Sequence, residues 1–134
     1  MNRLLIFLAI ISLSAVCACR GSQPVAPIPS PPPGQTFVDV LADQLKAINY
    51  QPIVTRDGEA VIIRVRVSST IDVPRAMCRA GGWPFGDRTV RFDETLRGLR
   101  QEGVRRIQIV GDKETLPMHI NPQGKCESGI AEIK

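Results

Sequence analysis

The fold of this chain is decided by residues 52–67, PIVTRDGEAVIIRVRV, where two strand-like runs flank an Asp-Gly pair. Asp57-Gly58 predicts a tight hairpin, because both residues tolerate the positive φ of a type I′ turn. In the second run the side chains expected on one face are Val61, Ile63, Val65 and Val67. Those expected on the opposite face are Ile62, Arg64 and Arg66. This alternation predicts a sheet with one face on the core and one in solvent.

A helix is predicted before the hairpin, over residues 37–48. Thr36 and Asp39 have the spacing of a capping box, in which a Thr hydroxyl accepts from a backbone amide in the first helical turn. The apolar residues that recur at helical spacing are Phe37, Leu41, Leu45 and Ile48. One face of this helix should therefore pack on the sheet.

A second helix is predicted over residues 93–101, with Asp93 as its cap and Gly103 ending it in the left-handed conformation. Its buried side is expected to carry Phe92, Leu96 and Leu99. Residues 68–92, between hairpin and helix, are interrupted by glycines and prolines, and we expect a long irregular loop there. Such a loop is unusual in a small domain and is often functional.

Three further strands are expected over residues 104–110, 115–120 and 130–133, the second at a sheet edge because Pro117 lacks an N–H. The predicted order is α-β-β-loop-α-β-β. The fold class is therefore α+β, with two helices packed on one face of a small, mostly antiparallel sheet.

The N-terminal residues 1–18 have the pattern of a secretory signal peptide. Arg3 precedes a ten-residue apolar run, residues 4–13, broken only by Ser12. Such a run is too short for a membrane span, which needs about 20 residues. The expected organisation is a signal over 1–18, a lipidated Cys19 and Pro-rich linker over 19–35, and a periplasmic domain over 36–134.

The residues Val16-Cys17-Ala18-Cys19 resemble the lipobox of bacterial lipoproteins. The resemblance implies cleavage before Cys19 and lipidation of its thiol, and several acyl chains suffice for stable anchoring. Arg20 stands where inner-membrane retention favours Asp, so the resemblance implies the outer membrane. Cys17 departs from the pattern, which usually has Ser, Thr or Ala there. Ordinary signal-peptidase cleavage near Ala18 is the alternative.

The linker is proline-rich: residues 20–35 read RGSQPVAPIPSPPPGQ, with six prolines among sixteen residues. At about 3.1 Å per residue, a polyproline spacer of this length holds a domain on the order of 50 Å from the membrane. The alternative is a proline-rich ligand for the groove of a partner.

The side chains of the domain offer little for catalysis. Cys78 and Cys126 are the only cysteines after Cys19, and an oxidising compartment predicts a disulfide between them. His119 is the single histidine, so the supply of metal ligands is too small for a zinc site. We expect no metal, no cofactor and no enzymatic activity. A net charge of +4 and 4% aromatic residues argue against a nucleic-acid partner.

Arginine is concentrated in one part of the chain: ten arginines lie between Arg64 and Arg106, against five acids and no lysine. One interpretation is codon bias and a solvated face; the other is a surface for acidic partners. Trp83 and Phe85 lie between glycines and either cover the core or anchor a partner. The residues predicted to form one partner-binding surface are Trp83, Phe85, Arg64, Arg66 and Arg105.

The expected function is a structural or assembly subunit of a cell-envelope complex, binding an envelope protein with an acidic surface. Over residues 36–120 the element order resembles the N-terminal ring domains of secretins and TolR/ExbD-like periplasmic domains. This resemblance implies assembly in the envelope, with a link to secretion, and transfers no functional residue. The alternative is a periplasmic inhibitor or binder of a cell-wall lytic enzyme that uses the Trp83 loop.

Overall fold

A computed structural model of the chain describes residues 30–67 and 70–127. The helices are α1 (Phe37–Ala47), α2 (Asp72–Met77) and α3 (Asp93–Gln101). The strands are β1 (Ile53–Asp57), β2 (Ala60–Arg64), β3 (Trp83–Phe85), β4 (Arg88–Val90), β5 (Arg106–Val110), β6 (Thr115–Ile120) and β7 (Cys126–Glu127).

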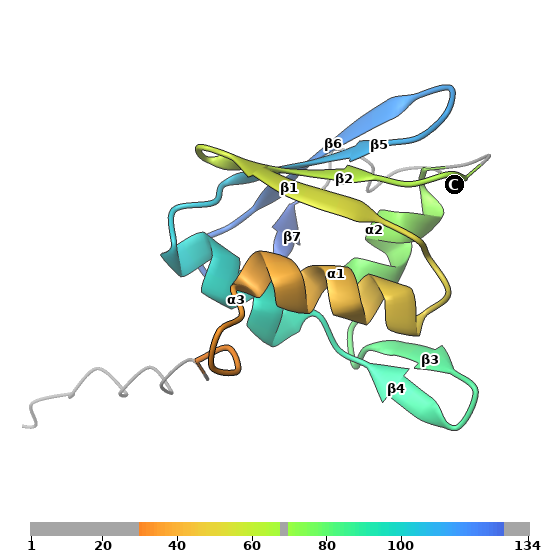
Figure 1. Cartoon of the computed structure of the whole chain (residues 1–134), viewed down its shortest axis with the longest axis horizontal. Helices are drawn as coiled ribbons and strands as arrows, with labels where there is room; N and C mark the ends of the chain where they lie inside the picture. The colour runs from red at the N-terminus through yellow and green to blue at the C-terminus, as the bar shows by residue number, and fades with distance from the viewer. Residues whose placement is uncertain (1–29, 68–69, 128–134) are drawn as a thin grey trace, which may run out of the picture.

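Five of the strands form one mixed sheet in the order β1-β2-β5-β6-β7, and β3 and β4 form a separate hairpin. The β2–β5 pair is parallel, and the other neighbours are antiparallel. Helices α1 and α3 lie on the same side of this sheet (Figure 1). The predicted α+β class and the mostly antiparallel sheet are confirmed.

The core lies between the helices and the inner face of the sheet. Its largest fully buried side chains are Phe92, Leu41, Leu45, Ile63, Leu96, Leu99, Ile107, Ile109, Met118, Val61, Val73 and Val104. The strand residues among them alternate with exposed or half-buried neighbours, as the period of two requires, except that Ala60 beside Val61 is also buried. The predicted inner face of β2 is therefore confirmed.

The β1–β2 hairpin forms as predicted, but its turn is shifted by one residue. Asp57 is the last residue of β1 to pair, with Ala60, so the loop is Gly58-Glu59. Gly58 has a φ of 57°, whereas Glu59 has no positive φ. Glycine at the first loop position is the type II′ arrangement, not the predicted type I′ turn.

Helix α1 begins with the predicted capping box. The Thr36 hydroxyl accepts from the Asp39 amide, and the Thr36 N–H donates to the Asp39 carboxylate at 2.7 Å. The Thr36 hydroxyl also donates to the Asp39 carboxylate, at 2.8 Å. The two bonds that the carboxylate accepts, the backbone one first, hold the pKa of Asp39 below its usual value.

Helix α3 has the predicted bounds but not the predicted cap. Phe92 occupies the N-cap without a side-chain bond, and Asp93 is the first helical residue, paired with Arg91 at 3.3 Å. Because Phe92 is buried in the core, it takes the N-cap position, one residue before Asp93, the cap that the polar pattern indicates. Gly103 has the expected positive φ, 94°.

The prediction of an irregular loop over residues 68–92 is wrong. The described part of this segment contains α2 and the β3–β4 hairpin. Pro74 lies in the first turn of α2, where an N–H has no helical partner, so it does not interrupt the helix. Gly86 opens the two-residue β3–β4 turn with a φ of 63°, in the same way as Gly58. The described part of the domain therefore has three helices rather than two.

Pro117 lies in β6 opposite Gln108 of β5. The prediction of an edge strand is wrong, because β6 lies between β5 and β7 in the described sheet. Pro117 is tolerated there because β7 pairs with β6 only at His119 and Ile120. The strand expected over residues 130–133 lies outside the described residues.

Candidate functional site

The side of the sheet opposite α1 and α3 carries no described helix (Figure 1). The strand register places on this side the residues that we call the outer sheet face: Ile53, Thr55, Asp57, Ala60, Ile62, Arg64, Arg106, Gln108, Val110, Thr115, Pro117, His119 and Glu127. Arg66 follows in the same alternation, two residues after Arg64, and both are exposed.

Arg64 and Arg66 therefore lie where the sequence predicts, but Arg105 does not. Arg105 immediately precedes β5 and shares the register of the inward-pointing Ile107. Its guanidinium lies 3.9 Å from Glu59 at the end of the sheet. Arg106, opposite Ala60, is the arginine of β5 on the outer sheet face. The alternation of Ile107 and Ile109 is the signal that identifies Arg106.

The outer sheet face combines cations with apolar side chains. Arg64, Arg66 and Arg106 form no ion pair with any carboxylate in the described part of the chain. Ile53 is 64% exposed, which is unusual for a large apolar residue in a sheet. The sequence did not predict Ile53 on this face, because the run of residues that forms β1 is too short to show an alternation of apolar and polar side chains.

The acids of the outer sheet face lie together at one end. Asp57, Ala60, Arg106, His119 and Glu127 form one row across the five strands. In this row Arg106 lies two strands away from Asp57 on one side and two strands away from Glu127 on the other. The end of the face that carries Arg64 and Arg66 is more strongly cationic.

Trp83 and Phe85 lie in β3, on the opposite side of α1 from the sheet (Figure 1). Trp83 is half-buried and packs against the core, with the guanidinium of Arg79 at 5.5 Å from its ring centroid. Phe85 is 45% exposed. The structure therefore does not bring these aromatic residues to the arginines of the outer sheet face, because α2 carries the chain past the sheet before β3 begins.

The predicted disulfide is present. Cys78, at the C-cap of α2, is bonded to Cys126 of β7, with a Cα–Cα distance of 5.6 Å. The bond connects the segment that follows α2 to the last described strand.

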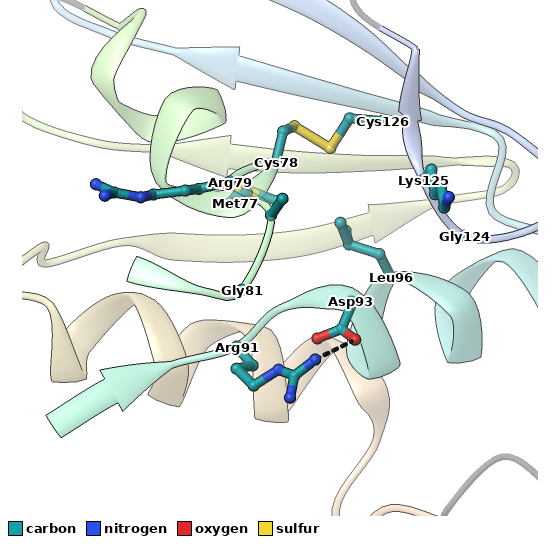
Figure 2. A pocket seen from close by; sticks show the side chains of 11 residues that line it. Met77, Cys78, Arg79, Gly81, Arg91, Asp93, Leu96, Gly124, Lys125 and Cys126 are labelled. Atoms are coloured by element: carbon teal, nitrogen blue, oxygen red, sulfur yellow. Dashed lines mark hydrogen bonds and ion pairs between the residues drawn. A yellow bond between two sulfur atoms is a disulfide. The ribbon is translucent and has the colours of Figure 1, made fainter. Parts of the chain in front are cut away.

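A cleft of about 370 Å³ lies beside this disulfide (Figure 2). It is lined by Met77, Cys78, Arg79, Ala80, Gly81, Arg91, Asp93, Leu96, Gly124, Lys125 and Cys126. Figure 2 shows Arg91 turned to Asp93, whereas the side chain of Arg79 extends away from both. The charged groups do not converge, and the lining has no hydroxyl, free thiol or imidazole to form a nucleophile and base.

Two titratable groups outside this cleft have shifted pKa values. The carboxylate of Glu114 accepts from the Thr70 N–H at 3.0 Å and from its hydroxyl at 2.8 Å. These bonds, the backbone one first, lower the pKa of Glu114. Burial, with a contribution from Asp72, raises the pKa of Tyr50. The Thr70–Glu114 contact joins two loops, and Tyr50 packs against the core, so neither group lines a reactive centre.

Within residues 30–67 and 70–127 there is no group of three or more His, Cys, Asp or Glu side chains that could hold a metal ion. No helix in that part of the chain is long and apolar enough to cross a membrane. The predicted lipidation site, Cys19, lies outside the described residues. The chain matches no protein-family model, no curated protein sequence and no solved structure.

Proposed function

We propose that this chain is a lipid-anchored periplasmic subunit of a cell-envelope assembly, tethered to the outer membrane through Cys19. It binds an acidic protein partner and performs no catalysis. The lipobox-like residues 16–19 and the proline-rich linker support the tether. The Cys78–Cys126 disulfide is consistent with an oxidising compartment.

The observation that carries the binding function is the outer sheet face. Its arginines have no described acidic partner, and Arg64 lies directly opposite the exposed side chain of Ile53. Arginine and exposed apolar residues are typical of protein interfaces, and the cations favour an acidic partner. On a face that contacts only water, a large apolar side chain as exposed as that of Ile53 contributes nothing to stability.

The position of the linker also supports this surface. The chain enters α1 from residues 30–36 on the helix side of the domain (Figure 1). The outer sheet face is therefore on the opposite side of the domain from residues 30–36, and a linker that joins the domain there leaves this face accessible.

Site-specific photo-crosslinking in cells tests this proposal. A benzophenone amino acid at Thr55 or Gln108, on the outer sheet face, should yield the same covalent adduct. The matched control is Glu94, an exposed residue of α3 on the helix side. We expect the combined Arg64→Ala and Arg106→Ala substitutions to abolish the adduct. An adduct from Glu94 alone, or one that is insensitive to the arginines, contradicts the proposal.

One observation favours the inhibitor alternative: the β3–β4 hairpin carries Phe85 on the side away from the sheet (Figure 1). An exposed aromatic residue on a short hairpin suits insertion into an enzyme cleft. If the domain inhibits a lytic enzyme in this way, Phe85→Ala should abolish inhibition of cell-wall hydrolysis and leave the outer-face adduct unchanged.

A further inference from the structure

Strand β2 ends at Arg64, opposite Ile53, the first residue of β1. The chain beyond it stays beside β5, because Val65 donates its N–H to the Val110 carbonyl at 3.0 Å. From Val65 onward this continuation of β2 has no residue of β1 paired with it, and we call its other side the free edge of β2.

The main chain of Arg66 points to this free edge. In a strand, the N–H and C=O of successive residues point to opposite neighbours. Because the Val65 N–H points to β5, the Arg66 N–H and C=O point to the β1 side. Neither group has a backbone hydrogen bond to a described residue. Arg66 thus offers a donor and an acceptor for one more strand residue.

Two adjoining hollows meet at Arg66, and we call them together the Arg66 groove. One, of about 200 Å³, is lined by Gln51, Ile53, Arg64, Val65, Arg66, Val110, Gly111 and Asp112. The other, of about 310 Å³, is lined by Asn49, Tyr50, Gln51, Val65, Arg66 and Val67. The groove therefore lies between residues 49–51 and the free edge of β2.

The side chains that line the Arg66 groove indicate what kind of ligand it binds. Arg64 and Arg66 project on the outer side, and Asp112 is the single acid among the lining residues. On the inner side, Val65 and Val67 are buried or half-buried, and Tyr50 packs against the core. A strand placed here meets arginines on one face and apolar side chains on the other.

We propose that the Arg66 groove binds an extended segment of the acidic protein partner, in which carboxylates alternate with apolar residues, as a short strand added beside β2. This inference rests on the proposed function and specifies how its partner binds. An acidic residue opposite Arg66 exchanges main-chain hydrogen bonds with it and presents its carboxylate to Arg64 and Arg66, whose guanidinium groups suit bidentate pairing. The apolar residues on either side of it face Tyr50, Val65 and Val67.

The test is an NMR titration of the ¹⁵N-labelled full-length chain in detergent micelles. Three blocked peptides are compared: Val-Glu-Val-Glu-Val, Val-Lys-Val-Lys-Val, and the acidic peptide N-methylated at both glutamates. We expect the acidic peptide to shift the Arg66 amide resonance and to slow its hydrogen exchange. The lysine peptide lacks the carboxylates and the methylated peptide lacks the main-chain donors, so each should bind about tenfold more weakly or worse.

The variants separate strand addition from general attraction between charges. Arg66→Ala should weaken binding of the acidic peptide about tenfold or more. Arg88→Ala removes the same charge from an exposed position in β4, outside both the groove and the outer sheet face, and should leave the affinity unchanged. Equal losses in the two variants, equal binding of the methylated peptide, or no shift at Arg66 overturns the inference. If the outer-face adduct still forms in that case, the groove fails and the proposed function stands; if the adduct is also absent, both fail.

Discussion

At the scale of single residues, close packing leaves little room for change between the two helices that cover the sheet. Gly98 lies in the middle of α3, where its missing side chain accommodates the ring of Phe37 from α1. A Cβ atom at this position overlaps the ring atoms of Phe37. This glycine is therefore required by a close approach and not by its φ angle.

Gly98→Ala should destabilise the domain by about 1–3 kcal/mol, although alanine favours helices, because the added methyl group forces Phe37 out of the core. Urea unfolding measures the change. Adding Phe37→Leu should recover part of the loss, whereas Glu94→Ala, an exposed control in α3, should have little effect. A neutral or stabilising Gly98→Ala substitution contradicts the close contact.

The contact between Thr70 and Glu114 predicts a dependence of stability on pH. The pKa of Glu114 is lowered in the folded state, so its stabilising effect is present above the unfolded value of 4.5 and is lost as the pH falls through the folded pKa. Glu114→Gln should therefore lower the unfolding free energy at pH 7, with the difference from the parent protein shrinking below pH 4.5. Thermal unfolding across this range measures the effect, with the exposed Glu59→Gln as control. A difference that does not depend on pH contradicts this role.

At the scale of secondary structure, the elements with a strong local signal were predictable and the others were not. Helix α1 follows from its capping box and apolar spacing, and the β1–β2 hairpin follows from its alternation. Helix α2 has six residues, too few for a periodic pattern, and its buried Val73 and Met77 hold it in place. The placement of Arg64 and Arg66 on one face was predictable from the same alternation. Their separation from Trp83 was not, because it depends on the path of residues 65–82.

The disulfide connects two elements that are too short to be stable alone, α2 and β7. Its sequence separation of 48 residues corresponds to a stabilisation of about 4 kcal/mol in the chain-entropy model. The double substitution Cys78→Ser and Cys126→Ser should lower the unfolding free energy by about 2–4 kcal/mol. It should also speed hydrogen exchange in α2 and β7 more than in α1.

Thiol labelling under denaturing, non-reducing conditions supplies an independent check on that bond. The folded protein isolated without reducing agent should yield no labelled Cys78 or Cys126. Two labelled thiols, or unchanged stability in the double variant, contradict the structural role of the disulfide.

At the scale of the whole molecule, the proposed tether requires that Cys19 carry lipid. Cys19→Ser should move the protein from the membrane fraction to the soluble periplasmic fraction, because the acyl chains are then absent. Cys17→Ser is the matched control: it substitutes a neighbouring cysteine with a residue common in the lipobox, so the protein should stay with membranes. Fractionation followed by immunoblotting measures both variants. Membrane association and processing of Cys19→Ser identical to the parent contradict the lipoprotein proposal.

The parallel pairing of β2 with β5 has a consequence for the order of folding. Two of the three hairpins in the described sheet, β1–β2 and β5–β6, join long strands that are adjacent in the sequence and close short loops. The pairing of residues 60–64 with residues 106–110 instead closes a loop that contains α2, the β3–β4 hairpin and α3. Loop closure of this length is entropically unfavourable, and contacts distant in sequence slow folding. We expect the two hairpins to form early and the central β2–β5 pair to form late, so a chain interrupted at this stage exposes the unpaired edges of both central strands.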